Sequence, residues 1–122
     1  MAEDSTSREA FNPARLLDIF DGDTPAIRQV IDETITLMRD ILAKLAVGTE
    51  AARPQCRALV HELKGLSGNV GADQLHALSQ EIEARLRDPS RDFSSCGCAE
   101  LDEPYSRFLA GVERYLASGV SL

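Results

Sequence analysis

Residues 56–71 read CRALVHELKGLSGNVG, and up to Val70 this stretch has the pattern of an amphipathic helix. At about 100° per residue, its apolar side chains form one stripe with alternating spacings of three and four. The stripe consists of Cys56, Leu59, Leu63, Leu66 and Val70. His61 lies roughly opposite the centre of the stripe. We therefore expect the apolar side to anchor this helix while the imidazole of His61 faces solvent.

The outer face of the same helix carries one cation and two glycines beside His61, namely Lys64, Gly65 and Gly68. A glycine inside a helix costs about 1 kcal/mol relative to alanine, so two on one face indicate another demand on that surface. Close approach of a second molecule would meet that demand. We interpret this face as a contact site around an exposed imidazole.

The composition narrows the class of protein. A chain of 122 residues suits one domain, and 43% hydrophobic residues with 5% aromatics and no Trp predict an aliphatic core, as in helical bundles. A net charge of −7 argues against a nucleic-acid-binding protein. No apolar run approaches the roughly 18 residues of a membrane span, so we expect a cytoplasmic protein.

The three cysteines do not indicate a disulfide scaffold, because their number is odd and no signal peptide precedes them. Cys56 fits a small core residue. Cys96 and Cys98 form a C-x-C pair that could bind a metal or act as a redox pair. A lone C-x-C pair with no histidine near it does not by itself indicate either function.

The rest of the chain predicts an all-α fold, since we find neither strand alternation nor an internal repeat. Asn12-Pro13 and Thr24-Pro25 are helix starts, with Asn12 and Thr24 as N-caps, whereas Gly48, Gly71 and Asp88-Pro89 are stops. We expect an antiparallel up-down-up-down four-helix bundle with a short additional N-terminal helix. The expected helices span about 13–20, 25–47, 49–70, 73–87 and 99–117. Residues 1–10 are predicted to be a disordered tail, residues 11–122 the domain, and residues 89–98 a loop.

Residues 57–87 resemble the histidine-containing phosphotransfer (HPt) domain family. The family pattern is roughly H-x-L-K-G-x-[SA]-x-x-[LIV]-G-x-x-x-L. It is matched without a gap by His61, Leu63, Lys64, Gly65, Ser67, Val70, Gly71 and Leu75, and the match continues to Glu83. The resemblance covers nearly all of the chain except the N-terminal tail. Val60, where the family often has a small residue, and the loop 89–98 depart from it, and both departures concern the choice of partner.

The resemblance implies a phosphohistidine carrier that accepts a phosphoryl group from a receiver-domain aspartate and passes it to another receiver. Its expected partners are receiver domains of hybrid histidine kinases or response regulators. It implies no ATP site and no cofactor or metal of its own, with Mg²⁺ in the receiver. We expect a monomer. An initiating Met and an end soon after the last helix favour a free-standing protein.

The matched positions carry expected roles. His61 is the phosphoacceptor, because a neutral imidazole has a free lone pair near pH 7. Lys64 supplies charge for the phosphoryl oxygens, and Gly65 and Gly68 provide access for the receiver. By resemblance, Glu83 accepts a hydrogen bond from the other imidazole nitrogen. Arg87 lies one turn further on and either assists with phosphate charge or pairs with Glu83.

Docking is expected to use an apolar patch flanking His61, formed by the short first helix and the helix 25–47.

Other interpretations compete with these assignments. His61 could be an ordinary surface histidine, and Glu83 a plain surface carboxylate. His76 is predicted to lie at the solvent edge of its helix. The whole chain could be a bundle that binds a receiver or kinase without being phosphorylated.

Overall fold

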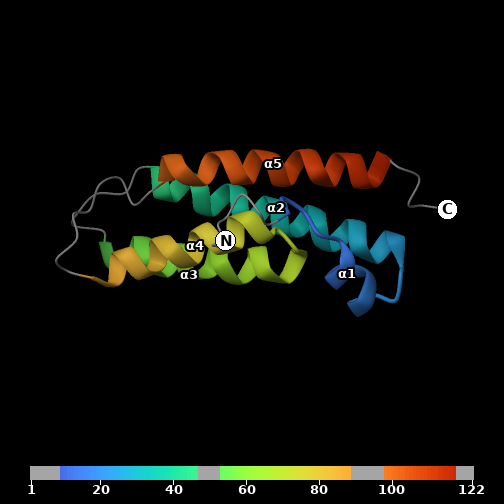
Figure 1. The fold of residues 1–122 in the computed structure, drawn as a ribbon, viewed down its shortest axis with the longest axis horizontal. Coiled ribbons are helices and arrows are strands. Elements are labelled where there is room, and N and C mark those ends of the chain that lie inside the picture. The colour runs from blue at the N-terminus through green and yellow to red at the C-terminus, as the bar shows by residue number, and fades with distance from the viewer. Residues whose placement is uncertain (1–8, 47–52, 89–97, 118–122) are drawn as a thin grey trace, which may run out of the picture.

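The computed structural model describes residues 9–46, 53–88 and 98–117 (Figure 1). Within these ranges the regular elements are all helices, so the all-α prediction is confirmed. The helices are α1 (Ala14–Ile19), α2 (Thr24–Ala46), α3 (Arg53–Val70), α4 (Asp73–Arg87) and α5 (Cys98–Ala117). Where the described ranges allow a comparison, the helix ends agree with the predicted ones within one or two residues. The predicted stop at Gly48, the start near residue 49 and most of the loop 89–98 lie outside the described residues.

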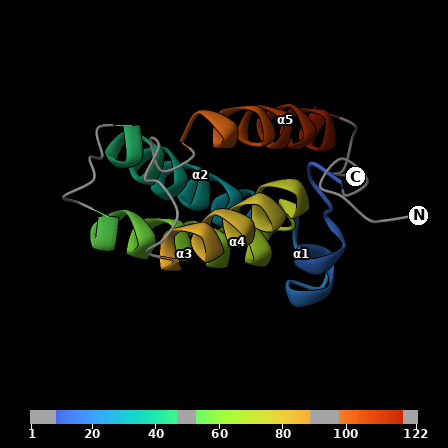
Figure 2. The same cartoon turned by 60° about the vertical axis from the view of Figure 1, so that its left-hand side comes forward.

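The four longer helices lie side by side, and α1 lies at the end of the molecule where α2 begins (Figures 1 and 2). The closest pair is α3 with α4. Two residues, Gly71 and Ala72, separate these helices, so α4 folds directly back against α3. The helix α2 packs against α3 and α5, and α4 also packs against α5. No helix in the described ranges is both long and apolar enough to cross a membrane.

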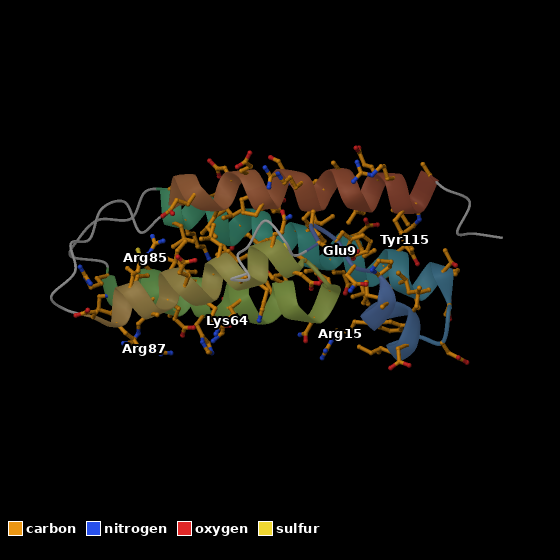
Figure 3. The ribbon with its side chains drawn as sticks, viewed as in Figure 1. Glu9, Arg15, Lys64, Arg85, Arg87 and Tyr115 are labelled. Carbon is orange, nitrogen blue, oxygen red and sulfur yellow. The ribbon has the colours of Figure 1, made fainter. Side chains whose placement is uncertain are left out.

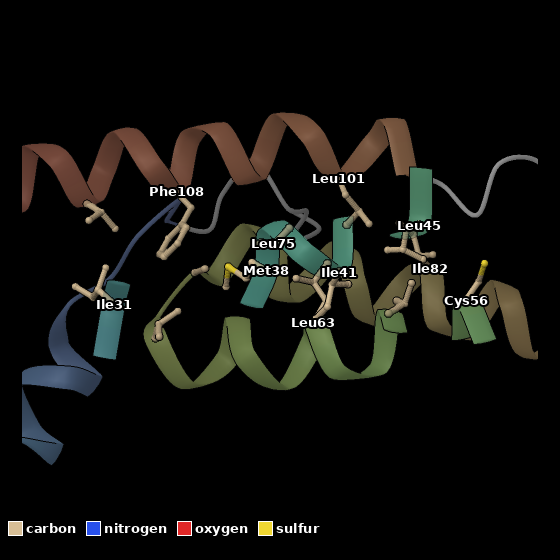
Figure 4. Packing of buried hydrophobic residues seen from close by; sticks show 14 of the residues in the cluster. Ile31, Met38, Ile41, Leu45, Cys56, Leu63, Leu75, Ile82, Leu101 and Phe108 are labelled. Carbon is tan, nitrogen blue, oxygen red and sulfur yellow. The ribbon is translucent and has the colours of Figure 1, made fainter. Parts of the chain in front are cut away.

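The core is aliphatic, as the composition predicts. Met38 and Ile41 of α2 share one buried cluster with Leu63 of α3, Leu75 of α4 and Phe108 of α5 (Figure 4). The buried residues of α2 recur at helical spacing, so this helix presents one stripe to the core. They are Ile27, Ile31, Thr34, Met38, Ile41 and Leu45. Leu37 lies outside this stripe and is 47% exposed.

The buried side of α3 differs from the predicted stripe. Val60 and Ser67 are completely buried, whereas Leu59 and Leu66 are partly buried at the margin. The reason is that α3 has neighbours on more than one side, so its buried face is wider than a single stripe. Ser67 is tolerated there because its hydroxyl donates to the Leu63 carbonyl at 2.7 Å. Cys56 is a buried free thiol, as predicted.

At the starts of α1 and α2, a side chain accepts a hydrogen bond from a backbone N–H of the helix. The Asn12 Oδ1 atom accepts the N–H of Ala14 at 3.0 Å, in agreement with the predicted cap, although the helical residues begin after Pro13. The predicted cap Thr24 is wrong by one residue. The Asp23 Oδ1 atom accepts the N–H of Ala26 at 3.2 Å, so Asp23 is the N-cap and Thr24 is the first helical residue.

The segment before α1 crosses the turn between α3 and α4. The Asn12 N–H donates to the Gly71 carbonyl at 2.7 Å, and the Gln74 N–H donates to the Glu9 carbonyl at 3.1 Å. Gly71 has φ +80°, and a Cβ there would collide with the Asn12 carbonyl oxygen. Gly71 therefore ends α3 and also leaves room for this crossing, which holds the α3–α4 pair in place. Residues 1–8 of the predicted tail lie outside the described residues.

Candidate functional site

His61 faces outward from α3 next to a completely buried neighbour. Its side chain is 64% exposed, whereas Val60 is 0% exposed. The step of about 100° between successive helical residues produces this contrast, because it turns His61 away from the side that Val60 packs into the core. Across the α3–α4 interface, the Nδ1 atom of His61 lies 2.7 Å from the Oε2 atom of Glu83. The ring is thus exposed but oriented.

Glu83 is the centre of the polar cluster. Its side chain is 6% exposed, and it also receives the ammonium of Lys64 at Oε1 (2.8 Å) and the guanidinium of Arg87 at Oε2 (3.1 Å). A buried carboxylate requires such partners, because desolvation penalises an unpaired charge. The structure therefore brings together His61, Lys64, Glu83 and Arg87, the four residues that the sequence singled out for chemistry.

The partners of Glu83 determine its charge state. The hydrogen bond from Lys64 is the largest influence and lowers the pKa of Glu83 below its ordinary value of 4.5, against the opposing effect of burial. The hydrogen bond from His61 lowers this pKa further. Glu83 is therefore ionised at neutral pH and can only accept hydrogen bonds.

The ionised state of Glu83 defines the tautomer of His61. Because the carboxylate has no proton to donate, the Nδ1 atom of His61 carries the hydrogen of this bond, and the neutral ring keeps its lone pair on Nε2. Within the described residues, no hydrogen bond reaches that Nε2 atom. The available nucleophile is therefore the ring nitrogen that does not face Glu83.

A surface hollow of about 360 Å³ adjoins His61. It is lined by Pro54, Arg57, Ala58, His61, Glu83 and Arg87. Arg57 is not among the residues expected at the site from the sequence, although its spacing was a signal. It lies four residues before His61 and hence on the same helical face. Its side chain is exposed and has no hydrogen-bond or ion-pair partner among the described residues.

Lys64 and Arg87 lie on the same side of the α3–α4 pair (Figure 3). Arg85 is two residues from Arg87 but extends toward α5, where it binds Glu100 at 2.7 Å. The two arginines at the end of α4 therefore serve different neighbours. Arg87 belongs to the His61 cluster, whereas Arg85 links two helices of the domain.

The two glycines expected beside His61 have different surroundings. A Cβ on Gly65 would meet nothing within 4 Å, so this position is open. A Cβ on Gly68 would lie 3.1 Å from the Nδ1 atom of His76. The structure thus gives an internal reason for Gly68, because its missing side chain makes room for a ring from α4.

His76 is more than a histidine at the solvent edge of its helix. It is half-buried, and its Nδ1 atom lies 2.9 Å from the backbone carbonyl of Lys64. A carbonyl only accepts, so Nδ1 donates in this contact. His76 therefore fastens α4 to the part of α3 that carries Lys64.

The model of the family described as Hpt domain matches residues 16–111. The chain belongs to the Hpt domain family. Domains of this family act in histidine phosphotransfer in two-component phosphorelays and interact with receiver domains. Comparisons with curated proteins and with solved structures gave no significant match.

A metal site at the C-x-C pair is outside what the structure describes, since Cys96 lies in an undescribed range and the side chain of Cys98 is likewise undescribed. In the described ranges, no three His, Cys, Asp or Glu side chains are placed to hold a metal ion together. The role of Cys96 and Cys98 therefore stays a prediction to be tested by metal analysis of the purified protein.

Proposed function

We propose that His61 of this Hpt domain is the phosphoacceptor, taking a phosphoryl group from an aspartate of one receiver and passing it to an aspartate of another. The observation that carries this proposal is the exposed ring whose Nδ1 atom is bound to a buried, ionised carboxylate. This arrangement supplies what an in-line attack requires, namely an accessible lone pair on Nε2 and a ring of defined orientation.

In the proposed reaction, the Nε2 lone pair of His61 forms a P–N bond as the P–O bond of the aspartyl phosphate breaks, and the aspartate leaves as a carboxylate. The proton on Nδ1 stays in place, so the phosphorylated ring acquires positive charge. Glu83 faces that nitrogen and stabilises this charge. Attack by a second aspartate on the phosphorus reverses the sequence and restores the neutral imidazole.

Lys64 has a further proposed role in charge neutralisation. In the free protein its ammonium binds Glu83, with its side chain 25% exposed. When a phosphoryl group arrives, Lys64 can turn toward it, because Glu83 retains its bonds from His61 and Arg87. Gly65 faces open space beside this group and leaves room for a receiver backbone.

The arrangement of the helices, the oligomeric state and the docking surface form part of the same proposal. We infer an antiparallel four-helix bundle formed by α2 to α5, with α1 as an addition, acting as a cytoplasmic monomer. The Mg²⁺ ion belongs to the receiver, and the domain itself has no ATP site. Docking uses apolar side chains that remain exposed on α1 and α2, which are Leu17, Ile19 and Leu37.

The direct test is phosphotransfer from a radiolabelled receiver to the purified domain. We expect acid-labile phosphate on the wild type and none on His61→Gln, while His76→Gln still accepts phosphate. If His61→Gln is labelled, the assigned site is wrong. Receiver binding without labelling of the wild type would instead support a domain that acts by interaction alone.

A further inference from the structure

The hollow beside His61 lies on the side toward the start of α3. Three of its lining residues, Pro54, Arg57 and Ala58, come from the first turns of α3, and Arg87 lines it from the end of α4. Lys64 is not among the lining residues. The imidazole therefore stands between two cationic regions, with Lys64 on one side and the two arginines of the hollow on the other.

Helix geometry favours the hollow as the place for a group attached to His61. Side chains on an α-helix lean toward its N-terminus and cover the preceding turn. The ring of His61 therefore leans toward the turn that contains Arg57 and Ala58, where the methyl of Ala58 occupies little volume. A hollow of about 360 Å³ is open at that point.

The charges that line the hollow favour an anion. Both oxygens of Glu83 already bind cationic or N–H partners, so its negative charge is locally compensated by His61, Lys64 and Arg87. Arg57 adds a positive charge with no partner in the described part of the chain. An exposed guanidinium with five donors can bind two oxygens of a phosphoryl group at once.

We propose that Arg57 is a phosphoryl-binding residue, whose guanidinium binds the oxygens of the phosphoryl group carried by the Nε2 atom of His61. This inference rests on the proposed function of His61. Arg57 reaches the group without breaking any ion pair, whereas Lys64 must first release Glu83. Arg57 thus neutralises phosphoryl charge from the hollow without itself taking a partner away from Glu83.

The test compares Arg57→Gln and Arg57→Lys with the wild type and with Arg114→Gln as the matched control. Arg114 is also exposed and without a partner in the described residues, but lies on α5. Each protein is phosphorylated with phosphoramidate, a small donor that requires no docking surface, and the initial rate of phosphohistidine formation is measured. A parallel series uses a phosphorylated receiver.

We expect Arg57→Gln to slow phosphorylation by phosphoramidate about tenfold, as for loss of one charge-assisted hydrogen bond at a partly exposed site. Arg57→Lys should recover part of the rate, because it restores the charge without the bidentate geometry. Arg114→Gln should match the wild type. Arg57 is exposed, so thermal unfolding should show that the variants remain folded.

Three results would overturn the role of Arg57 while leaving the proposed function intact. They are equal phosphoramidate rates for Arg57→Gln and wild type, an equal loss in Arg114→Gln, and a loss seen with the receiver but not with phosphoramidate. The last would assign Arg57 to receiver contact. A wild-type protein that accepts phosphate from neither donor would overturn the proposed function and the role of Arg57 with it.

Discussion

His61 and His76 both join α3 to α4 through their Nδ1 atoms, but in opposite directions. His61 extends from α3 to the carboxylate of Glu83, and His76 extends from α4 to the carbonyl of Lys64. The ring of His61 is exposed and its partner is charged. The ring of His76 packs over Gly68 and its partner is neutral. Two histidines of one helix pair thus differ in exposure and in the charge of their partner, and these two features favour His61 over His76 as the proposed phosphoacceptor.

The largest effect in this comparison is expected from removing the charge of the His61 partner. Glu83→Gln should lower the phosphotransfer rate about 10- to 100-fold, because an amide can also donate to Nδ1 and so permit the tautomer that lacks a lone pair on Nε2. Glu81→Gln is the matched control, since Glu81 is exposed on the same helix and pairs with Arg85. A rate for Glu83→Gln within twofold of that control would contradict the tautomer argument.

Gly65 and Gly68 offer a second comparison between the exposed surface beside His61 and the packed contact with His76. Gly65→Ala should raise the free energy of unfolding by about 0.5–1 kcal/mol, because alanine favours the helix and its methyl meets open space. The same change should slow transfer from a receiver, whose approach it obstructs. Denaturant unfolding and phosphotransfer measured on the same protein check both expectations. Faster transfer in the variant would argue against Gly65 as part of the contact surface.

Gly68→Ala should not show this gain in stability. Its methyl would lie 3.1 Å from the His76 ring, and the repulsion should offset the helix propensity of about 1 kcal/mol. In the His76→Ala background the same substitution should become stabilising, because the ring is gone. A double-mutant cycle of unfolding free energies measures this coupling. If the two substitutions change the unfolding free energy additively, the His76 ring does not restrict the side chain at position 68.

His76→Ala should cost about 1 kcal/mol of stability through the lost hydrogen bond to the Lys64 carbonyl. Once the folded fraction is accounted for, the variant should still accept phosphate on His61. Chemical denaturation gives the first quantity and labelling the second. Complete loss of labelling in a folded His76→Ala protein would show that this histidine has a role in the chemistry.

Glu83 should also make the stability of the fold depend on pH. The folded-state pKa of Glu83 lies below its ordinary value of 4.5, so in acid the folded protein binds fewer protons than the unfolded chain. The stability from Glu83 is therefore present above about pH 4.5 and is lost as the pH falls through the folded-state pKa. Wild type should exceed Glu83→Gln by about 1 kcal/mol at pH 7, and denaturation curves should converge in acid. A difference in unfolding free energy between the two proteins that does not change with pH would contradict this expectation.

Much of the site follows from relations inside one helix. His61, Lys64 and Gly65 lie within about one turn, so their common face is a property of helical periodicity alone. The helix ends near Asn12 and Gly71 were also predictable, because capping and positive φ are local properties. The wrong cap at Thr24 shows the limit, since Asp23 and Thr24 are both good capping residues.

The other features of the site depend on how α3 packs against its neighbours, above all α4. The burial of Val60 and Ser67, the covered position of Gly68 and the hollow at Arg57 all depend on which turn of one helix faces which turn of the other. The amino-acid sequence by itself determined an exposed histidine with a neighbouring cation, because both lie on a single periodic element. The family resemblance implied that Glu83 bonds to that histidine. Only the tertiary structure decided that Glu83 is buried and ionised among Lys64 and Arg87, because this environment joins two helices whose register depends on core packing.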